Sequence, residues 1–361
     1  MQIKLQILVK VLIGDYMHEV NLEKFHLRTD LAIDDFNDLE SDNYKKKIVN
    51  NNVYIEEVNI KDLELSKKYK KKIGIYKTIC FKDITDSTNF NDVLKAFSIT
   101  FKEMLDENNI KEEDSVLVIG LGNKKSTPDA LGPKSLTHIL VTRHLFNLGE
   151  VENGYRNVSI LEPGVTGETG IETKDTIFSI TNTIKPKFII VIDALATTSI
   201  DRLNKTIQIS NSGITPGSGV NNCRVSIDKD TMNIPVIVIG IPTIIDSSVI
   251  VANTIKYMMK KFSYDKDNIN NKSNKLKYKI DYKDYDKDLD NKDKKFLLGI
   301  IGTLEEEQLL KLVFEVLNPI DYNFMVTPKE IDFLIDKLSL LIGKGLNIAL
   351  HKNITNTTFT V

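Results

Sequence analysis

The sequence predicts an α/β protein whose mostly parallel sheet carries helices on both faces. Three continuous apolar runs support this class: SVLVIG at 115–120, KFIIVID at 187–193 and IPVIVIGI at 234–241. Such runs are typical of parallel strands that are buried on both faces. Segments with helical spacing alternate with these runs, as βαβ units require.

The other elements are predicted in order along the chain. The first 30 residues have no strong period, and the segments 53–58 and 74–81 resemble short strands. In residues 87–108 the apolar side chains mostly recur at three- and four-residue steps, which predicts a helix. The same criterion predicts four further helices, at residues 134–148, 247–261, 304–317 and 327–346.

The composition is that of a globular protein with a sizeable core. Of 361 residues 41% are hydrophobic, and 48 Lys and Arg against 50 Asp and Glu give a formal net charge of −2. This balance provides no basic field for nucleic acid. Cys80 and Cys223 lie far apart, which argues against a disulfide framework or zinc–thiolate site and fits a reducing compartment. No uncharged apolar run reaches the roughly 18 residues that a membrane span needs.

Residues 263–295 differ from the rest of the chain. They are mainly Lys, Asp and Asn, with few apolar side chains. Because such a segment buries too little surface to offset its ordering entropy, the sequence predicts a flexible charged insertion. The acids at 286–293 alternate as in a calcium loop, but Asn291 and Leu297 stand where that loop needs Gly and Glu. We therefore expect no calcium site there.

Two aspartates follow the predicted strands. Asp193 comes directly after the apolar residues 188–192, and Asp129 lies in the loop GLGNKKSTPDALGP at 120–133. In open parallel sheets, active groups collect at the carboxyl ends of the strands. Two carboxylates held close together can share a proton and divide the acid and base roles on a bound water. An N-cap or a turn would use the same residues, so spacing alone leaves their role open.

Other patterns are less specific. After GLGN, Lys125 stands where a dinucleotide fingerprint needs its third glycine, which disfavours nucleotide binding. Loops rich in glycine and threonine at 163–173 and 211–220 can line a peptide groove or serve only as turns. No two histidines have metal-ligand spacing, and we interpret His138 and His144 as structural.

Several separated blocks match one known family. They are RTDLA (28–32), GLGN (120–123), TPDALGP (127–133), EPGVTGETGIET (162–173), VIDALA (191–196), SGITPGSGV (212–220), IGIPTIID (239–246), MVTPKEID (325–332) and NIALH (347–351). In this order and over this span, they make the sequence resemble the germination proteases of endospore-forming bacteria.

The resemblance implies an aspartic-type endopeptidase that begins the degradation of small acid-soluble spore proteins during germination. The catalytic residues of the family fall on Asp129 and Asp193 by motif. The resemblance further implies a fold similar to that of the hydrogenase maturation peptidases and a homotetramer in the cytoplasm of the forespore or spore core. It implies no cofactor, no metal, no membrane association and no direct contact with nucleic acid.

The matching blocks also suggest processing and substrate contacts. Residues 1–27 are expected to be a self-removed propeptide, and 28–361 a single peptidase domain. Since the family favours bonds that follow glutamate, we expect cleavage between about residues 22 and 28, near Glu23 and Phe25. The leader is longer than is usual in the family, so Met17 is an alternative start. We assign substrate binding to Gly122, Asn123, Gly164, Gly167, Thr169, Thr215 and Gly217.

Two alternative functions stay open at this point. Peptidases related to the family use acids and histidine around a metal, so Asp129 and Asp193 could belong to a metallopeptidase. We favour the metal-free pair because no histidine stands beside either acid in the sequence. The second alternative is a non-catalytic protein that binds spore proteins, which would tolerate the loss of both acids.

Overall fold

The computed structural model describes residues 29–36, 38, 41–215, 226–271, 282, 285–317 and 324–355. Glu23 and Phe25 of the expected propeptide and Gly217 of the expected substrate site lie outside the described residues. The chain divides into two compact units, and residues 29–245 and 326–355 belong to the larger one. Residues 246–325 belong to the smaller unit.

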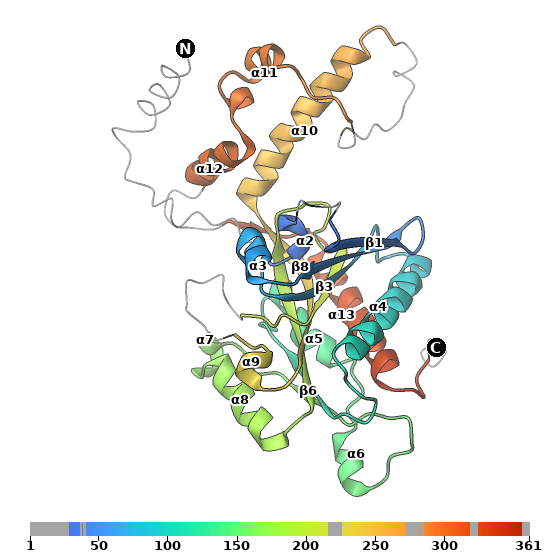
Figure 1. The fold of residues 1–361 in the computed structure, drawn as a ribbon. Helices are drawn as coiled ribbons and strands as arrows, with labels where there is room; N and C mark the ends of the chain where they lie inside the picture. The colour runs from blue at the N-terminus through green and yellow to red at the C-terminus, as the bar shows by residue number, and fades with distance from the viewer. Residues whose placement is uncertain are drawn as a thin grey trace. The chain divides into compact units, whose positions relative to one another are not determined.

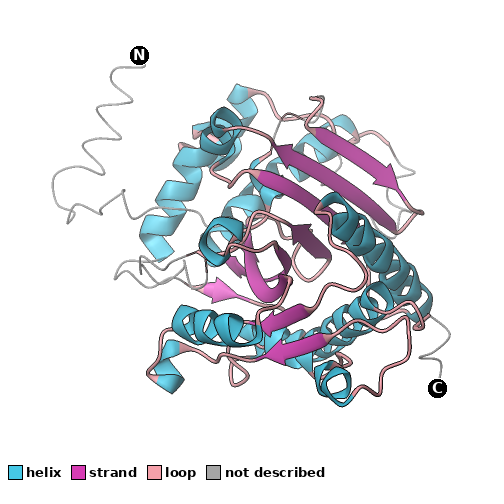
Figure 2. Ribbon diagram, turned by 60° about the horizontal axis from the view of Figure 1, so that its bottom comes forward, coloured by secondary structure: helices cyan, strands magenta, loops and turns pink. Residues whose placement is uncertain are grey.

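One mixed sheet organises the larger unit (Figures 1 and 2). The strand order is β1-β2-β3-β7-β8-β6-β4-β5, and β9 pairs with β8. Pairing is parallel from β8 through β6 and β4 to β5, and antiparallel from β1 through β2, β3 and β7 to β8. The strands are β1 (Tyr44–Ile48), β2 (Val53–Ile60), β3 (Gly74–Phe81), β4 (Val116–Gly120), β5 (Val158–Leu161), β6 (Phe188–Thr197), β7 (Thr206–Ser210), β8 (Val236–Asp246) and β9 (Met325–Val326).

The predicted α/β class is confirmed, and the three apolar runs are the parallel strands β4, β6 and β8. The sheet contains more antiparallel pairing than these runs indicated. The additional pairing comes from β1, β2, β3 and β7. The segments 53–58 and 74–81 predicted β2 and β3, whereas β1 and β7 were not predicted. The strand β1 lies exposed, and β2 alternates between buried and half-buried positions. Alternation of this kind is typical of antiparallel strands with one solvated face.

Helices cover both faces of the sheet (Figure 2). On one face, α4 (Ser87–Glu107), α5 (Leu131–Leu136) and α13 (Ile331–Leu350) pack against Ile190 and Ile192 of β6. On the other face, α8 (Thr173–Ile184) and α9 (Lys229–Met232) pack against Ile189 and Val191. Shorter helices lie in the connections: α2 (Ala32–Asp35), α3 (Leu63–Tyr69), η2 (Thr127–Asp129), α6 (Arg143–Leu148) and α7 (Thr166–Thr169).

The single helix predicted over residues 134–148 is wrong, because the chain forms α5 and α6 with a break at 137–142. Asn347 of α13 accounts for part of the break. Its side-chain amide donates to the carbonyl of His138 (2.9 Å) and accepts from the N–H of Leu140 (2.9 Å). These bonds hold two backbone groups in a tertiary contact, so local helical spacing could not show where α5 ends.

The smaller unit contains α10 (Ser247–Asp267), α11 (Asn291–Leu298), η5 (Ile301–Thr303) and α12 (Glu306–Leu317). The helices predicted at 247–261 and 304–317 are therefore present. Ala252 of α10 packs against Leu309 and Val313 of α12. Within the charged segment 263–295, α10 continues to Asp267 and α11 begins at Asn291. The flexibility of the remaining insertion stays a prediction.

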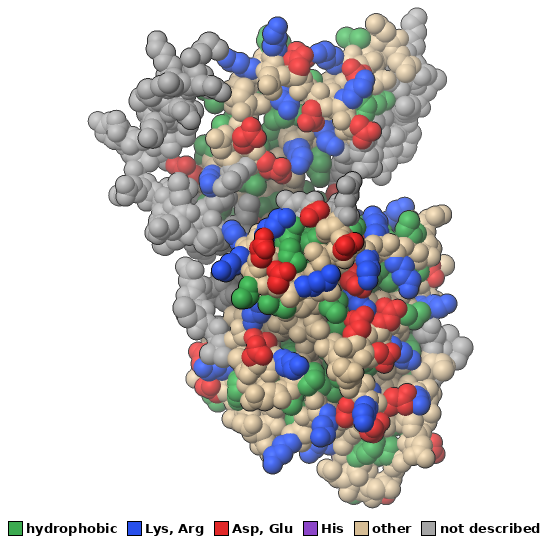
Figure 3. All heavy atoms as spheres, in the orientation of Figure 1, with side chains coloured by type: hydrophobic (Ala, Val, Ile, Leu, Met, Phe, Trp, Pro, Cys, Tyr) green, Lys and Arg blue, Asp and Glu red, His purple; other side chains and the backbone are tan. Residues whose placement is uncertain are grey.

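The charged groups of the larger unit are mixed on its surface. Figure 3 shows Lys and Arg side chains interspersed with Asp and Glu over the face in view. On this face no single-sign field forms, as the near-neutral composition leads us to expect. None of the described helices is long and apolar enough to cross a membrane.

His351, at the end of α13, is buried beside Arg156. Its Nδ1 atom accepts the backbone N–H of Arg156 (3.1 Å). The Arg156 guanidinium donates to the carbonyls of Lys111 (2.7 Å) and Asp114 (2.8 Å), which ties the connection before β4 to the end of the chain. Burial, together with the charge of Arg156, lowers the pKa of His351 to about 4. The imidazole is therefore neutral in the folded protein near pH 6.

This neutral histidine predicts a loss of stability in mild acid. The unfolded chain binds a proton at His351 below about pH 6.5, whereas the folded chain binds it only near pH 4. Stability is therefore complete above pH 6.5 and falls by on the order of 3 kcal/mol as the pH approaches 4. His351→Asn, which keeps an acceptor for the Arg156 N–H, should show a smaller loss over this range in thermal melts.

The matched control is His144→Asn, because His144 is exposed on α6. This variant should have the pH dependence of the unmodified protein. Parallel stability curves for His351→Asn and the unmodified protein between pH 6.5 and 4 would contradict the assignment.

Candidate active site

Asp193 is the first polar residue of β6, which continues to Thr197. Its Oδ1 atom accepts the backbone N–H of Ala194 (2.9 Å). Because side chains alternate along a strand, Asp193 points to the same face as Val191 and Leu195. In the ladder it stands opposite Gly240 of β8, and Gly240 stands opposite Gln208 of β7. Asp193 and Gln208 thus flank a residue without a side chain.

Gly240 keeps space open at this point of the sheet. A Cβ atom there would lie 2.2 Å from Cδ1 of Leu195, so any other residue would displace that side chain. Asp193, Leu195 and Gln208 line a pocket of about 290 Å³. Its remaining lining residues are Thr29, Asp30, Lys70, Lys71, Lys72, Tyr76, Ser210, Ser212, Gly213, Ile214, Thr215 and Val238.

Of these lining residues, the sequence singled out Asp193 and Thr215, and Ser212, Gly213 and Ile214 fall in the loop 211–220 that was considered for a peptide groove. The sequence assigned no role to the lysines 70–72 or to Gln208, which come from the antiparallel half of the sheet and its connections. Two signals were available in the sequence. Thr29 and Asp30 belong to the RTDLA block, and the three consecutive lysines follow a segment with helical character.

The segment after Arg28 forms one wall of the pocket and is bonded to the end of β6. The N–H of Asp30 donates to the carbonyl of Ala196 (3.0 Å), and the N–H of Ala196 donates to Oδ2 of Asp30 (2.8 Å). The N–H of Ala32 donates to Oε1 of Gln208 (2.8 Å). These bonds connect the start of the described chain to two strands that line the pocket.

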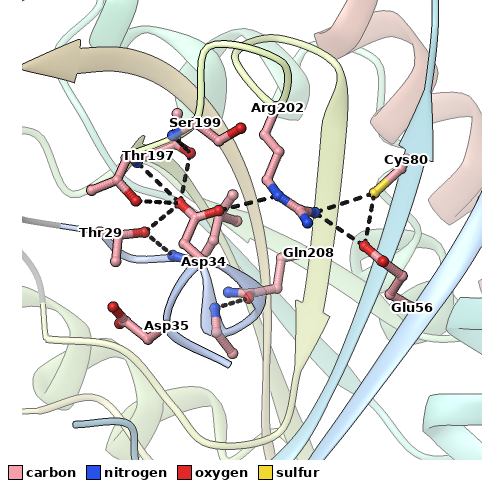
Figure 4. A network of polar contacts seen from close by, with 12 residues as sticks. Thr29, Asp34, Asp35, Glu56, Cys80, Thr197, Ser199, Arg202 and Gln208 are labelled. Atoms are coloured by element: carbon pink, nitrogen blue, oxygen red, sulfur yellow. Dashed lines mark hydrogen bonds and ion pairs between the residues drawn. The ribbon is translucent and has the colours of Figure 1, made fainter. Parts of the chain in front are cut away.

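A buried ionic network fixes the same wall (Figure 4). Oδ2 of Asp34 accepts hydroxyl groups of Thr29 (2.7 Å) and Thr197 (2.7 Å). The guanidinium of Arg202 bridges Asp34 (3.2 Å) and Glu56 (3.1 Å), whose side chains are 1% and 7% exposed. Burial opposes the charge of Arg202, but Cys80, Glu56 and Asp34 hold its pKa above the usual value. Arg202 is therefore the cation that compensates two buried carboxylates.

Asp129 ends η2, in the loop that connects β4 to α5. Oδ2 of Asp129 accepts the N–H of Asn123 (2.8 Å), and the backbone carbonyl of Asp129 accepts the same N–H (3.2 Å). Burial raises the pKa of Asp129, and the hydrogen bond from Asn123 partly offsets the rise. The carboxyl group thus retains its proton to a higher pH than an exposed aspartate does.

The Asp129 loop packs on the strand that carries Asp193. The N–H of Leu121 donates to the carbonyl of Ile192 (2.8 Å), the residue before Asp193. Helix η2 itself contacts β6. The structure therefore brings the elements of both acids together where β4 ends beside β6, but the expected strand end at Asp193 is wrong, because β6 continues to Thr197, and Asp129 does not line the 290 Å³ pocket.

Gly122 permits the tight form of this loop. Its φ angle is +114°, which side-chain-bearing residues rarely adopt, and a Cβ atom would lie 1.9 Å from the carbonyl oxygen of Asp129. The role assigned to Gly122 from the sequence as a substrate contact stays a prediction, and so does that of Asn123. The backbone conformation and the close approach of Asp129 explain why position 122 is glycine.

The loop after β5 lies beside the Asp129 loop. Lys124 pairs with Glu162, and Lys125 pairs with Glu168 of α7 at 3.0 Å. Gly167 and Thr169 are exposed on α7, and Gly164 is half-buried before it. Thr215 is separate from this loop, since it lines the pocket and its hydroxyl lies 3.1 Å from that of Ser226. The predicted substrate residues thus fall in three loops.

Among the described residues, no three His, Cys, Asp or Glu side chains are grouped as metal ligands would be. His138 follows α5 and His144 lies in α6, so they do not share one helix, and their structural interpretation stays a prediction. Burial lowers the pKa of His138.

Comparison with known proteins identifies the family. A family model described as germination protease matches residues 21–361. The chain belongs to the germination protease family. A germination protease from Bacillus mycoides is 42% identical over 357 residues, which cover 93% of this chain and 96% of the relative. One from Bacillus thuringiensis subsp. konkukian is 41% identical with the same coverage.

Among solved structures, a [NiFe] hydrogenase maturation protease, HycI from Thermococcus kodakarensis, is similar to part of the chain. It is 17% identical, has a TM-score of 0.27, and the match covers 40% of this chain and 80% of that protein. The α/β class of this germination protease family member rests on its own sheet. Family membership makes the chain a protease and connects it with spore germination.

The geometry of Gly122 leads to a direct prediction for this germination protease family member. In Gly122→Ala the new methyl group meets the backbone of Asp129, and the positive φ adds strain of about 1–3 kcal/mol. We expect lower thermal stability and a loss of peptidase activity, because the loop that holds the Asp129 carboxyl group must move. Gly149→Ala is the control, since its φ of +73° carries similar backbone strain, a Cβ there meets nothing within 4 Å, and Gly149 lies outside the site, so this variant should keep its activity. Equal behaviour of the two variants would contradict this account.

The Arg202 network gives a second prediction. Arg202→Met leaves the buried carboxylates of Asp34 and Glu56 without their cation, so we expect a loss of about 3–5 kcal/mol in unfolding free energy. Lys45→Met removes an exposed ion pair with Glu57 at 3.7 Å, where Lys45 is 76% exposed, and should cost less than about 1 kcal/mol. Denaturant titrations measure both losses, and a cost for Arg202→Met as small as that for Lys45→Met would contradict the bridging role.

Proposed function

We propose that this chain is an endopeptidase that begins the degradation of small acid-soluble spore proteins, with Asp129 and Asp193 as its catalytic acids. The observation that carries the proposal is the placement of Asp193, on β6, in a pocket, with the Asp129 loop packed on the same strand at Ile192. Membership in the germination protease family supplies the reaction class. Two acids at one sheet edge supply the groups that this reaction needs.

The environments of the two acids suggest their roles. Burial raises the pKa of Asp129, which favours its protonated form as the acid partner. Asp193 opens into the pocket and serves as the carboxylate that activates water. In this mechanism Asp193 takes a proton from water while the water oxygen attacks the scissile carbonyl carbon. Asp129 gives its proton to the leaving nitrogen as the C–N bond breaks.

The substrate lies along the loops at this edge. Backbone groups at 163–173 and 211–215 present hydrogen-bond donors and acceptors to an extended segment, as binding loops on a rigid sheet commonly do. Thr215 lines the pocket directly, which supports its assignment as a substrate contact. Gly164, Gly167 and Thr169 are proposed to contact the substrate farther along the same path.

The remaining proposals extend the family resemblance to this chain. The protein is made as a zymogen that removes residues 1–27 by its own activity, near Glu23 and Phe25. It assembles as a homotetramer and acts in the cytoplasm of the spore core, without a cofactor. The bonds from Asp30 to Ala196 support a role for the segment after residue 28, because they connect it to the strand that carries Asp193.

The catalytic assignment is tested by Asp129→Asn and Asp193→Asn, which keep the side-chain volume but remove the titratable group. We expect each variant to lose about 10²–10⁴-fold or more in the cleavage of a purified spore protein and in the removal of its own leader. Both reactions are followed by mass spectrometry, and thermal melts establish that the variants fold. Assays with and without a chelator measure whether the reaction also needs a metal.

Asp230→Asn is the matched control, because Asp230 is exposed on α9 and does not line the pocket. It should process itself and cut the spore protein at the unmodified rate. Unmodified rates for either Asp129→Asn or Asp193→Asn would show that the acid pair is wrong.

A further inference from the structure

The two edges of the sheet are protected to different degrees. At one edge, β1 carries three consecutive exposed lysines, at residues 45–47. Lysines at a sheet edge oppose pairing with a further strand, because that strand would crowd their solvated charges. At the other edge, β5 has the sequence VSIL and carries no charged side chain. The edge at β5 therefore lacks the protection against strand addition that β1 has.

The register of β5 shows which of its backbone groups point away from the sheet. The N–H of Val116 on β4 donates to the carbonyl of Asn157 (2.9 Å), the residue before β5. The backbone groups of successive residues point to opposite edges of a strand. Residues 159 and 161 therefore face β4 as Asn157 does, and residues 158 and 160 face outward.

Part of this outward edge is already occupied. The N–H of Val158 donates to the hydroxyl of Thr142 (2.9 Å), and its carbonyl accepts the N–H of Thr142 (3.1 Å). Within the part of the chain that the structure describes, no hydrogen bond reaches the backbone N–H or carbonyl of Ile160 or of the following Glu162. Pro163 comes next and has no N–H. A short open edge of residues 160–162 thus remains.

This open edge lies beside the loop that carries Asp129. Leu161 stands opposite Ile119 in the parallel ladder, so β5 and β4 end side by side. The carboxylate of Glu162 pairs with Lys124, which belongs to the Asp129 loop. A chain segment added to β5 can therefore continue over the carboxyl end of β4 toward the proposed catalytic acids.

We propose that the open edge at residues 160–162 docks an extended segment of the protein substrate, which pairs with β5 as an added strand. The inference rests on the proposed peptidase function and names a binding mode outside the loops assigned above. Main-chain hydrogen bonds provide the affinity in strand addition, so an unfolded substrate segment suits this edge. A second copy of the chain suits it less, because the edge spans three residues, whereas strands in stable sheets usually have about five or six.

The spacing of the strands determines which part of the substrate makes this contact. Neighbouring strands lie about 4.8 Å apart, so a strand added to β5 runs about 14 Å from β6, which carries Asp193. An extended chain covers about 3.3 Å per residue, so about four residues separate the docked segment from the scissile bond. The contact forms equally in the bound substrate and in the transition state, so it lowers KM without changing kcat.

The test compares Ile160→Pro with the unmodified full chain after its own processing. Proline removes the outward N–H of Ile160 and leaves the bonds of β5 to β4 in place, as proline on an edge strand does. The substrates are two peptides from one cleaved site, which extend about eight and about two residues to each side of the scissile bond. For the long peptide we expect a KM about three- to tenfold higher with kcat unchanged. The short peptide should be cleaved equally by both proteins.

Lys46→Pro is the matched control, because it places the same substitution at an outward position of the other edge. The N–H of Asn59 on β2 donates to the carbonyl of Asn43 (2.9 Å), so the odd-numbered residues of β1 face β2 and Lys46 faces outward. Lys46→Pro should have the KM of the unmodified protein for both peptides. Thermal melts compare the folding of the two proline variants.

A second measurement changes the substrate and does not depend on a variant that folds. One N-methyl group is placed in turn on each residue of the long peptide. In an added strand, N–H groups face the neighbouring strand only at every second residue. For the unmodified protein, KM should therefore rise at alternate positions from about four residues beyond the scissile bond, on one side of it.

The outcomes distinguish this inference from the function on which it rests. If the unmodified protein cleaves the long peptide but Ile160→Pro keeps its KM and the N-methyl series shows no alternation, the docking edge is wrong and the peptidase stands. A changed oligomeric state of Ile160→Pro in light scattering, with an unchanged KM, would assign the edge to a second copy of the chain instead. Failure of the unmodified protein to cleave any spore protein or peptide removes both proposals.

Discussion

The double burial of β6 is the constraint on which the rest of the larger unit depends. This strand is hydrogen-bonded to β4 on one edge and β8 on the other, and helices cover both of its faces. Residues 188–192 must therefore all be apolar, since a polar side chain there would be buried without a partner. Asp193 is the first polar position of this strand and only half-buried, and the buried positions resume at Leu195.

Burial of this kind also explains how much of the fold the sequence could predict. The strands β4, β6 and β8 were recognisable because continuous apolar runs are rare outside doubly covered sheets, and α4 was recognisable by its spacing. The exposed strand β1 has no such signature in its residues YKKKI. The break between α5 and α6 depends on Asn347, some 200 residues away in the chain, and local pattern cannot contain that information.

The candidate site was also only partly predictable from the sequence. Strand ends and motif blocks pointed to Asp129 and Asp193, because each follows an apolar run at the edge where parallel strands end. The pocket itself was not predictable, since Gln208 and the lysines 70–72 reach it only through antiparallel pairing of β7 with β3 and β8. The role of Arg202 was missed for a similar reason. Its two ion-pair partners, Asp34 and Glu56, are distant in sequence and come together only in the fold.

The absence of a Cβ atom at Gly240 leaves room for the side chain of Leu195 in the pocket. The neighbours of Gly240 across the ladder are Asp193 and Gln208, and a single methyl group there collides with Leu195, which lines the same cavity. The strand would remain fully paired after such a change, because its hydrogen bonds involve only the backbone. A substitution at position 240 would therefore change the shape of this pocket and leave the backbone pairing of the sheet and both aspartates in place.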